Sequence, residues 1–212
     1  VGYVADGIFK SQDEIDNHAT QEGAALGRIR WKDLNNDGKI TEADQEWIYD
    51  PTPDFTYGFN IYLEYKNFDF TAFFQGVQGV DIISDLKKET DIWAGLNIGF
   101  LNKGRRLLDA WSATNPNSNI PAVSLSDNNN EKRVSSYWVE NGSYLKLRTV
   151  QIGYNVPKSF AQKLAMERLR FYLSAQNLFT VKSSSFTGVD PENPNYGYPI
   201  PLNITFGLNV TF

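Results

Sequence analysis

The stretch "PLNITFGLNVTF", residues 201–212, alternates apolar and polar residues without a break. A period of two over about ten residues predicts a β-strand, and it matches the length of a strand that crosses an outer membrane. A long edge strand of a soluble sheet has the same pattern, so both interpretations are open at this point. Counted back by twos from the end, the apolar face carries Leu202, Ile204, Phe206, Leu208, Val210 and Phe212.

Four earlier segments repeat this alternation: residues 57–65, 68–76, 144–157 and 168–181. The two-residue connection of Lys66 and Asn67 predicts that the first two form a hairpin. The second face of these strands is polar enough for a water-filled lumen, with Glu64, Asp69, Arg148, Arg170 and Gln176. Aromatic residues near the strand ends suit the girdles at a membrane interface, although aromatics are common in any sheet: Tyr57, Tyr65, Phe68, Tyr154 and Phe212.

The connections between the strands differ in length. Residues 1–56 and 77–143 are long and mostly not strand, the second being helical in parts, whereas the link near residues 157–167 is short and helical in character. Long loops on one side and short turns on the other are typical of outer-membrane barrels. We therefore expect extracellular loops at 1–56, at 77–143 and near 181–200, a barrel hairpin at 57–76, and barrel strands within 144–212, with a periplasmic turn near 157–167.

Five strands cannot close a barrel, and an open sheet in lipid would leave backbone groups unpaired. The sequence therefore predicts an all-β fold that is the C-terminal portion of a large antiparallel transmembrane β-barrel. The rest of the barrel would come from residues outside this chain, which begins at Val1 and reads as a piece of something larger, or from another chain. On this interpretation, Leu208 is expected near the bilayer midplane.

Composition excludes several classes of function. The net charge of the 212 residues is -5, which argues against a nucleic-acid partner, and the lack of cysteine excludes disulfides and thiolate chemistry. The single histidine, His18, lies in a polar run and is expected on the surface. The sequence has no phosphate-binding loop, no dinucleotide fingerprint and no nucleophile elbow, so we expect no enzyme.

Residues 33–44, "DLNNDGKITEAD", have the ligand order of a twelve-residue calcium loop. Gly38 occupies the turn position, Thr41 stands at position 9, and the predicted ligands are Asp33, Asn35, Asp37, the carbonyl of Lys39, and Asp44. The alternative is a polar turn in which Thr41 and Asp44 cap a helix. The last ligand is Asp rather than Glu and "GRIRWK" before the loop is strand-like, so the loop resembles the single loops of dockerin-like modules. We expect a structural Ca²⁺ site with a Kd of about 10⁻⁴–10⁻³ M.

Four aromatic residues lie in the expected outer loops, where they could stack on sugars or pack the loops together: Trp93, Trp111, Tyr196 and Tyr198.

The order of motifs along the whole chain resembles the C-terminal part of SusC-like TonB-dependent outer-membrane transporters of Bacteroidetes. The segments that carry the resemblance are "DGIFKSQDEI", "KDLNNDGKITEAD", "PTPDFTYGFNIYLEYKNFDFTAFFQGVQGVDI", "YWVENGSYLKLRTVQIGYNVP", "LRFYLSAQNLFT", "TGVDPE" and "FGLNVTF".

The resemblance implies a barrel of about 22 strands in the outer membrane, of which this chain supplies roughly the last quarter. It also implies import of oligosaccharides, or in some members peptides, with a SusD-like surface lipoprotein as the lid and with TonB acting through an N-terminal region outside this chain. The terminal Phe212 fits the C-terminal aromatic residue of this class. From the residues alone, a secreted, calcium-stabilised β-sandwich that binds glycans or mediates adhesion is the alternative.

Overall fold

The computed structural model describes residues 1–91, 103–124, 126–194, 198 and 200–212. The chain forms two compact units. The first consists mainly of Val1–Pro51 and Asp81–Glu140, and the second mainly of Thr52–Val80, Asn141–Asn193 and Gly197–Phe212. None of the helices in the described ranges has both the length and the apolar character needed to cross a membrane.

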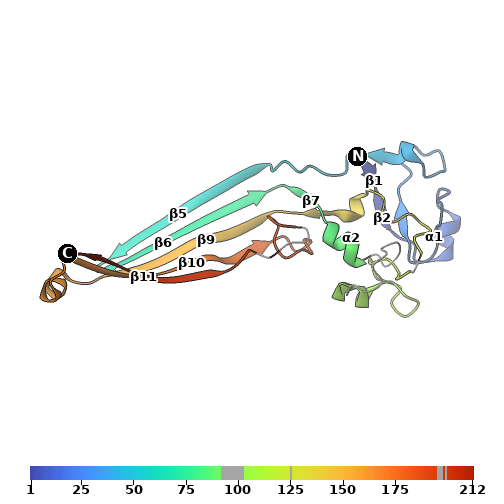
Figure 1. The fold of residues 1–212 in the computed structure, drawn as a ribbon. Coiled ribbons are helices and arrows are strands. Elements are labelled where there is room, and N and C mark those ends of the chain that lie inside the picture. Colours follow the sequence, from blue (N-terminus) through green and yellow to red (C-terminus); the bar gives the residue numbers. More distant parts are fainter. Residues whose placement is uncertain (92–102, 125, 195–197, 199) are drawn as a thin grey trace. The chain divides into compact units, whose positions relative to one another are not determined.

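The second unit is an antiparallel sheet of five long strands in the order β11-β10-β9-β6-β5 (Figure 1). Its strands are β5 (Phe55–Tyr65), β6 (Phe68–Gln78), β9 (Tyr144–Asn155), β10 (Arg168–Lys182) and β11 (Asn203–Thr211). All five predicted strands are confirmed, with small shifts at their ends. Because the five strands lie in one sheet rather than in two packed sheets, the β-sandwich alternative is wrong.

One end of this sheet carries the short connections, and we call it the turn end. The two-residue turn between β5 and β6 lies here, with Lys66 in the left-handed region at φ 55°. The link between β9 and β10 also lies here and contains α3 (Lys158–Ala161) and a 3-10 helix, Gln162–Leu164, as the sequence predicts. Figure 1 shows the C-terminus at the same end. We call the opposite end the long-loop end.

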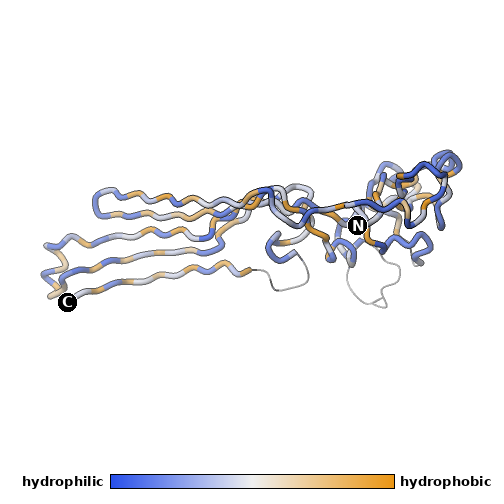
Figure 2. The backbone as a smooth tube through the Cα atoms, turned by 90° about the horizontal axis from the view of Figure 1, so that it is seen from above, coloured by the Kyte–Doolittle hydropathy of each residue, from blue (hydrophilic) through white to orange (hydrophobic). Residues whose placement is uncertain are grey.

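The register places apolar side chains in rows that run across the sheet, and we call this side the apolar face. Cross-strand neighbours of this kind are the unit of sheet packing. Figure 2 shows the underlying alternation along each strand. From the turn end, the rows are Tyr65, Phe68, Tyr154, Phe171 and Leu208; Leu63, Phe70, Ile152, Leu173 and Phe206; Ile61, Ala72, Val150, Ala175 and Ile204; Phe59, Phe74, Leu147 and Phe179; and Tyr57, Gly76, Leu145 and Val181.

The height of these rows matches a membrane. The eight steps from Tyr57 to Tyr65 cover about 27 Å along the strand at about 3.4 Å each. A strand tilt of about 40° reduces this to about 21 Å, close to the apolar band of about 25 Å in outer-membrane barrels. The first row is mostly aromatic, so it marks the edge of the band. Leu208 lies in that row and Ile204 in the middle row, so the register favours Ile204 over Leu208 as the β11 residue nearest the midplane.

A bulge interrupts the alternation near the long-loop end. Across the same step of the sheet, β6 advances by one residue (Phe73 to Phe74), β9 by two (Thr149 to Leu147) and β10 by three (Gln176 to Phe179). In β9 the apolar residues change from even to odd positions between Val150 and Leu147, and the extra residue keeps them all on the apolar face.

The first unit is built from short elements around a small core. Ile8, Ile29 and Trp31 are buried, and Trp111 and Ile40 pack against them. The elements are β1 (Gly2–Tyr3), β2 (Ala5–Ile8), α1 (Gln12–Asp16), β3 (Ile29–Trp31), β4 (Gln45–Glu46), β7 (Asp81–Ile83), α2 (Asp85–Asp91), β8 (Val139–Asn141) and the 3-10 helices Glu42–Asp44, Arg105–Asp109 and Ser136–Trp138. Within residues 77–143, the described helices are α2 and the 3-10 helices Arg105–Asp109 and Ser136–Trp138.

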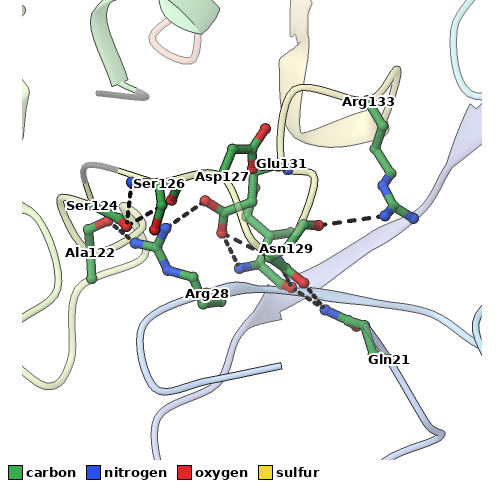
Figure 3. A network of polar contacts seen from close by, with 10 residues as sticks. Gln21, Arg28, Ala122, Ser124, Ser126, Asp127, Asn129, Glu131 and Arg133 are labelled. Carbon is green, nitrogen blue, oxygen red and sulfur yellow. Dashed lines mark hydrogen bonds and ion pairs between the residues drawn. The ribbon is translucent and has the colours of Figure 1, made fainter. Parts of the chain in front are cut away.

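A buried polar network ties β3 to the segment 127–133 (Figure 3). Glu131 accepts hydrogen bonds from Nη1 of Arg28 and from the backbone N–H of Ile29, both at 2.8 Å. Gln21 donates to the carbonyl of Ile29 at 2.8 Å, as does Asn129 at 2.9 Å. Burial raises the pKa of Glu131, and the charge of Arg28 opposes that rise. Side chains thus satisfy the backbone groups of β3, which would otherwise be costly to bury.

Candidate functional site

The second side of the five-stranded sheet, the polar face, carries mostly amide and hydroxyl side chains. The amides and hydroxyls are Asn60, Tyr62, Thr71 and Gln75 in β5 and β6, and Thr149, Gln151, Tyr172, Ser174, Gln176, Asn203, Thr205 and Asn209 in β9 to β11; Glu64 and Asp69 are carboxylates on the same face. Such groups hydrogen-bond to water or to a polar solute, and Phe73 is an aromatic residue among them, in register with Asn60 and Thr149. The two faces therefore suit two different solvents, as in the wall of a membrane barrel.

An ion pair crosses the polar face near the turn end. Arg170 in β10 donates from Nε to Oδ2 of Asp69 at 3.0 Å and from Nη2 to Oδ1 at 2.5 Å. These strands are not neighbours, because β9 lies between them. Gly153 of β9 lies beneath the pair, and a Cβ there would collide with both side chains.

A second set of charges, which we call the Lys146 cluster, lies toward the long-loop end and consists of Lys146, Arg148, Asp190 and Glu192. The side chain of Lys146 is 1% exposed, and its ammonium donates to Asp190 at 2.9 Å and to Glu192 at 2.5 Å. Arg148 pairs with the same Glu192 and donates to Gln75 at 2.8 Å. The two cations and two anions neutralise one another, which a buried lysine requires.

The Lys146 cluster holds residues 183–193 against the polar face. Phe186 in this segment is buried, and the ammonium of Lys182 lies 5.1 Å from the centre of its ring. The hydroxyl of Tyr144 donates to Glu192 at 2.6 Å. Burial alone would raise the pKa of Glu192, but the hydrogen bonds from Lys146, Tyr144 and Arg148 outweigh it and lower this pKa to about 2. The sequence contains the "TGVDPE" segment but nothing that predicts these partners.

The residues of the calcium-type loop form a tight turn. Asp33 accepts from the N–H of Gly38 through Oδ2 at 2.9 Å, and Asp37 accepts from the N–H of Lys39 at 2.9 Å. The N–H of Asp37 donates to the amide oxygen of Asn35 at 2.9 Å. The other oxygen of Asp33, Oδ1, is buried and has no hydrogen-bond partner among the described residues. An acceptor of this kind is a suitable cation ligand.

Asp44, the last of the predicted ligands, is fully buried and contacts the loop's own backbone. It accepts from the N–H groups of Leu34 at 2.9 Å and Thr41 at 2.7 Å, and it forms a capping box with Thr41. Burial works against its ionisation, but these backbone hydrogen bonds outweigh it and lower its pKa. The helix-capping interpretation is therefore observed. Within the described residues, no three His, Cys, Asp or Glu side chains come together as a metal site.

The other candidate residues have structural surroundings. The ring of His18 packs edge-on against Phe9 with centroids 5.1 Å apart, so it is less exposed than expected. Trp111 packs on the core of the first unit. Tyr198 is 96% exposed. Trp93 and Tyr196 lie outside the described residues.

Comparison with known proteins gives one consistent result. No family model matches the chain. The chain is 36% identical over its whole length to TonB-dependent receptor P3 of Formosa agariphila, and 34% identical over 97% of its length to receptor P26 of the same organism. It is 27% identical over its whole length to TonB-dependent receptor SusC of Bacteroides thetaiotaomicron. The chain spans 22%, 22% and 20% of these three relatives, respectively.

A solved structure has the same fold. The RagAB peptide transporter superimposes on the whole chain with a TM-score of 0.76 and 25% identity, and the match covers 22% of that longer chain. The matched part is the C-terminal part of its barrel. The chain therefore belongs to the SusC-like family of TonB-dependent outer-membrane receptors, in which it is a C-terminal part of the transmembrane β-barrel.

Proposed function

We propose that this chain forms part of the wall of a TonB-dependent importer that carries oligosaccharides or peptides across the outer membrane. The observation that supports this best is the two-sided sheet, with an apolar face of membrane height and a polar face of amides, hydroxyls and paired charges. The chain itself would supply part of the wall of the passage. In the complete receptor, a SusD-like lipoprotein would act as the lid, and TonB would act through the N-terminal region.

The proposed orientation places the long-loop end outside the cell and the turn end in the periplasm. Short periplasmic turns and long extracellular loops are general in bacterial barrels. The first unit, together with residues 183–193, would then belong to the extracellular side. Both substrate classes are consistent with the polar face, because amides and hydroxyls donate to and accept from both peptide and sugar groups.

The transport proposal is tested by placing one bulky side chain on either face of the same strand. In the full-length receptor, Gln151→Trp adds an indole to the polar face, and Val150→Trp adds one to the apolar face. Growth on a maltooligosaccharide mixture and on casein peptides is measured, with surface amount and heat-modifiable mobility as checks of folding. We expect the Gln151 variant to slow growth on one of these and the Val150 variant to have no effect. Equal growth of both variants on both nutrients would count against transport along this face.

We also propose that residues 33–44 bind a structural Ca²⁺ ion through Asp33, Asn35, Asp37, the Lys39 carbonyl and Asp44. The ligand order supports this, together with the turn at Gly38 (φ 80°) and the unpartnered Oδ1 of Asp33. A bound cation would neutralise the carboxylates that this loop gathers. It would stiffen a segment that has no disulfide.

The calcium proposal is tested by calorimetric titration of the full-length receptor with calcium chloride. We expect binding with a Kd of about 10⁻⁴–10⁻³ M that Asp33→Asn abolishes. Asp13→Asn is the matched control, since Asp13 is an acid in α1 outside the loop. Absence of binding, or binding that Asp33→Asn leaves unchanged, would show that the loop is only a capped turn.

A further inference from the structure

A hollow of about 330 Å³ lies at the long-loop end of the five-stranded sheet. Its base is formed by Tyr57, Leu145 and Val181, which belong to the last row of the apolar face. The fourth member of that row is Gly76, which has no side chain. The ring of Tyr57 occupies the space that a Cβ of Gly76 would need. The hollow therefore borders the last row of the apolar face beside the ring of Tyr57, and Asn141, Tyr144 and Lys182 also line it.

Beyond this last row, toward the long-loop end, the strands carry polar rather than apolar residues on this face. Gln78, Ser143 and Ser183 also line the hollow. Gln78 pairs with Phe55, one step beyond Tyr57 on the same face. Ser143 and Ser183 follow Leu145 and Val181 in the alternation, and the N–H of Ser183 donates to the carbonyl of Ser143 at 3.1 Å. The hollow thus lies on the boundary between the membrane band and the polar exterior.

The polar groups on this boundary are neutral. Gln78 contributes an amide, and the hydroxyl of Ser143 accepts from the N–H of Gly79 at 3.0 Å, so its own proton is available to a ligand. Among the described residues that line the hollow, Lys182 is the one cation, but its ammonium donates to the carbonyl of Gly188 and lies over the ring of Phe186. Neutral donors and acceptors suit sugar hydroxyls better than a phosphate, which favours cationic partners.

We propose that this hollow binds the sugar headgroup of a glycolipid in the outer leaflet. The apolar face below it is in contact with lipid, so the occupant that continues this contact is the headgroup of a lipid whose chains lie along the same strands. A tyrosine at this depth is typical of a membrane interface. The volume falls within the range of roughly 300–1,000 Å³ for small-molecule sites. The assignment to the outer leaflet rests on the proposed orientation and not on the transport of any substrate.

Native mass spectrometry of the full-length receptor in mild detergent tests this site. The probes are digalactosyl diacylglycerol and phosphatidylglycerol with the same acyl chains. We expect the glycolipid to bind more tightly than phosphatidylglycerol. The double variant Gln78→Ala with Ser183→Ala should weaken glycolipid binding about tenfold, which corresponds to about 1.4 kcal/mol. Ser183→Trp, which fills the hollow, should abolish it.

Two control variants separate this site from general lipid contact. Ala175→Leu enlarges a side chain on the apolar face in the middle row, and Gln151→Ala removes an amide from the polar face. Neither should change glycolipid binding. Equal binding of both lipids, or glycolipid binding that the double variant leaves unchanged, would overturn the proposal. If Ser183→Trp does not fold, the double variant still decides, because it only removes atoms. Nutrient uptake by the double variant should be normal. The glycolipid-binding result can therefore be interpreted even if the transport proposal fails.

Discussion

The guanidinium of Arg170 reaches the carboxylate of Asp69 across an intervening strand. The two hydrogen bonds, of 3.0 and 2.5 Å, join β10 to β6 over the backbone of β9. This is possible because Gly153 leaves the surface of β9 bare at this point. The pair therefore links three strands on the polar face, close to the aromatic row that lies on the opposite face.

Gly153→Ala is expected to separate this pair. The added Cβ would occupy the place of both charged groups. The free energy of unfolding should therefore fall by about 1.5–3 kcal/mol, as for hydrogen bonds between charged groups. Urea unfolding of the full-length receptor in vesicles measures it. Gly58→Ala is the control, because its Cβ would meet Phe73 at 3.2 Å and needs only a small adjustment. Similar losses in both variants would mean that glycine itself, rather than the ion pair, explains the effect.

The double variant Asp190→Asn with Glu192→Gln is expected to release residues 183–193 from the polar face. Lys146 would then be a buried cation without an anion, a state that costs about 3–5 kcal/mol when a buried pair is broken. Chymotrypsin should cleave after Phe186, which is 4% exposed in the intact protein. Glu64→Gln removes an acid elsewhere on the polar face and should leave cleavage unchanged. Protection of Phe186 in the double variant would contradict this role of the Lys146 cluster.

The same segment should respond to acid in a defined direction. The pKa of Glu192 is lowered from 4.5 to about 2, so its ionised form stabilises the folded segment. This contribution is complete above about pH 4.5 and is lost as the pH falls toward 2. Hydrogen exchange of residues 183–193, corrected for the intrinsic rate, should be constant from pH 7 to about 5 and then increase. Glu192→Gln should remove the increase, and a wild-type segment that opens above pH 5 would contradict the assignment.

An arginine scan along β11 tests the position of the membrane. Ile204→Arg, in the middle row of the apolar face, should cost about 2–4 kcal/mol, and Leu208→Arg, in the aromatic row, about 0–1 kcal/mol. Thr205→Arg points to the polar face and should be mild. Unfolding in urea with lipid vesicles compares the three variants. A larger cost at Leu208 than at Ile204 would shift the membrane toward the turn end.

Arg28→Met is expected to loosen β3 in the first unit. Glu131, whose side chain is 1% exposed, would be left as a buried anion without its cation. Hydrogen exchange should speed up at the amides of Ile29 and Trp31, which are bonded to Glu131 and Gln21. Lys32→Met, which removes an exposed cation beside β3, is the control. Unchanged exchange at both amides would show that the network of Figure 3 does not hold this strand.

The sequence predicts the sheet well because period-two alternation is a local property. All five long strands and the hairpin turn at Lys66 follow from it. The bulge was also visible in principle, since the apolar residues of β9 change phase between Leu147 and Val150. The depth of Leu208 does not follow from its own strand, because a single strand does not reveal its stagger. That depth depends on the row it shares with Phe171 and Tyr154 in other strands.

The charged contacts of the polar face were harder to predict than the strands, because they join residues far apart in the chain. Lys146 and Glu192 are 46 positions apart, and Asp69 and Arg170 are 101 apart. No local pattern pairs them. The loop at residues 33–44 shows the opposite difficulty, because its local pattern predicts two roles for Asp44. The structure shows the capping role, and the ligand role is the proposal that calcium titration tests.

The stepwise bulge has a consequence for how the complete receptor closes. A closed barrel must accumulate a fixed shear as its strands are followed around the circumference. The step near Thr149 adds no residue in β6, one in β9 and two in β10, so the offset grows across successive strands. Each added residue also bends its strand and increases the local twist. This chain therefore brings part of the barrel's curvature with it, encoded in the spacing between Gln176 and Phe179.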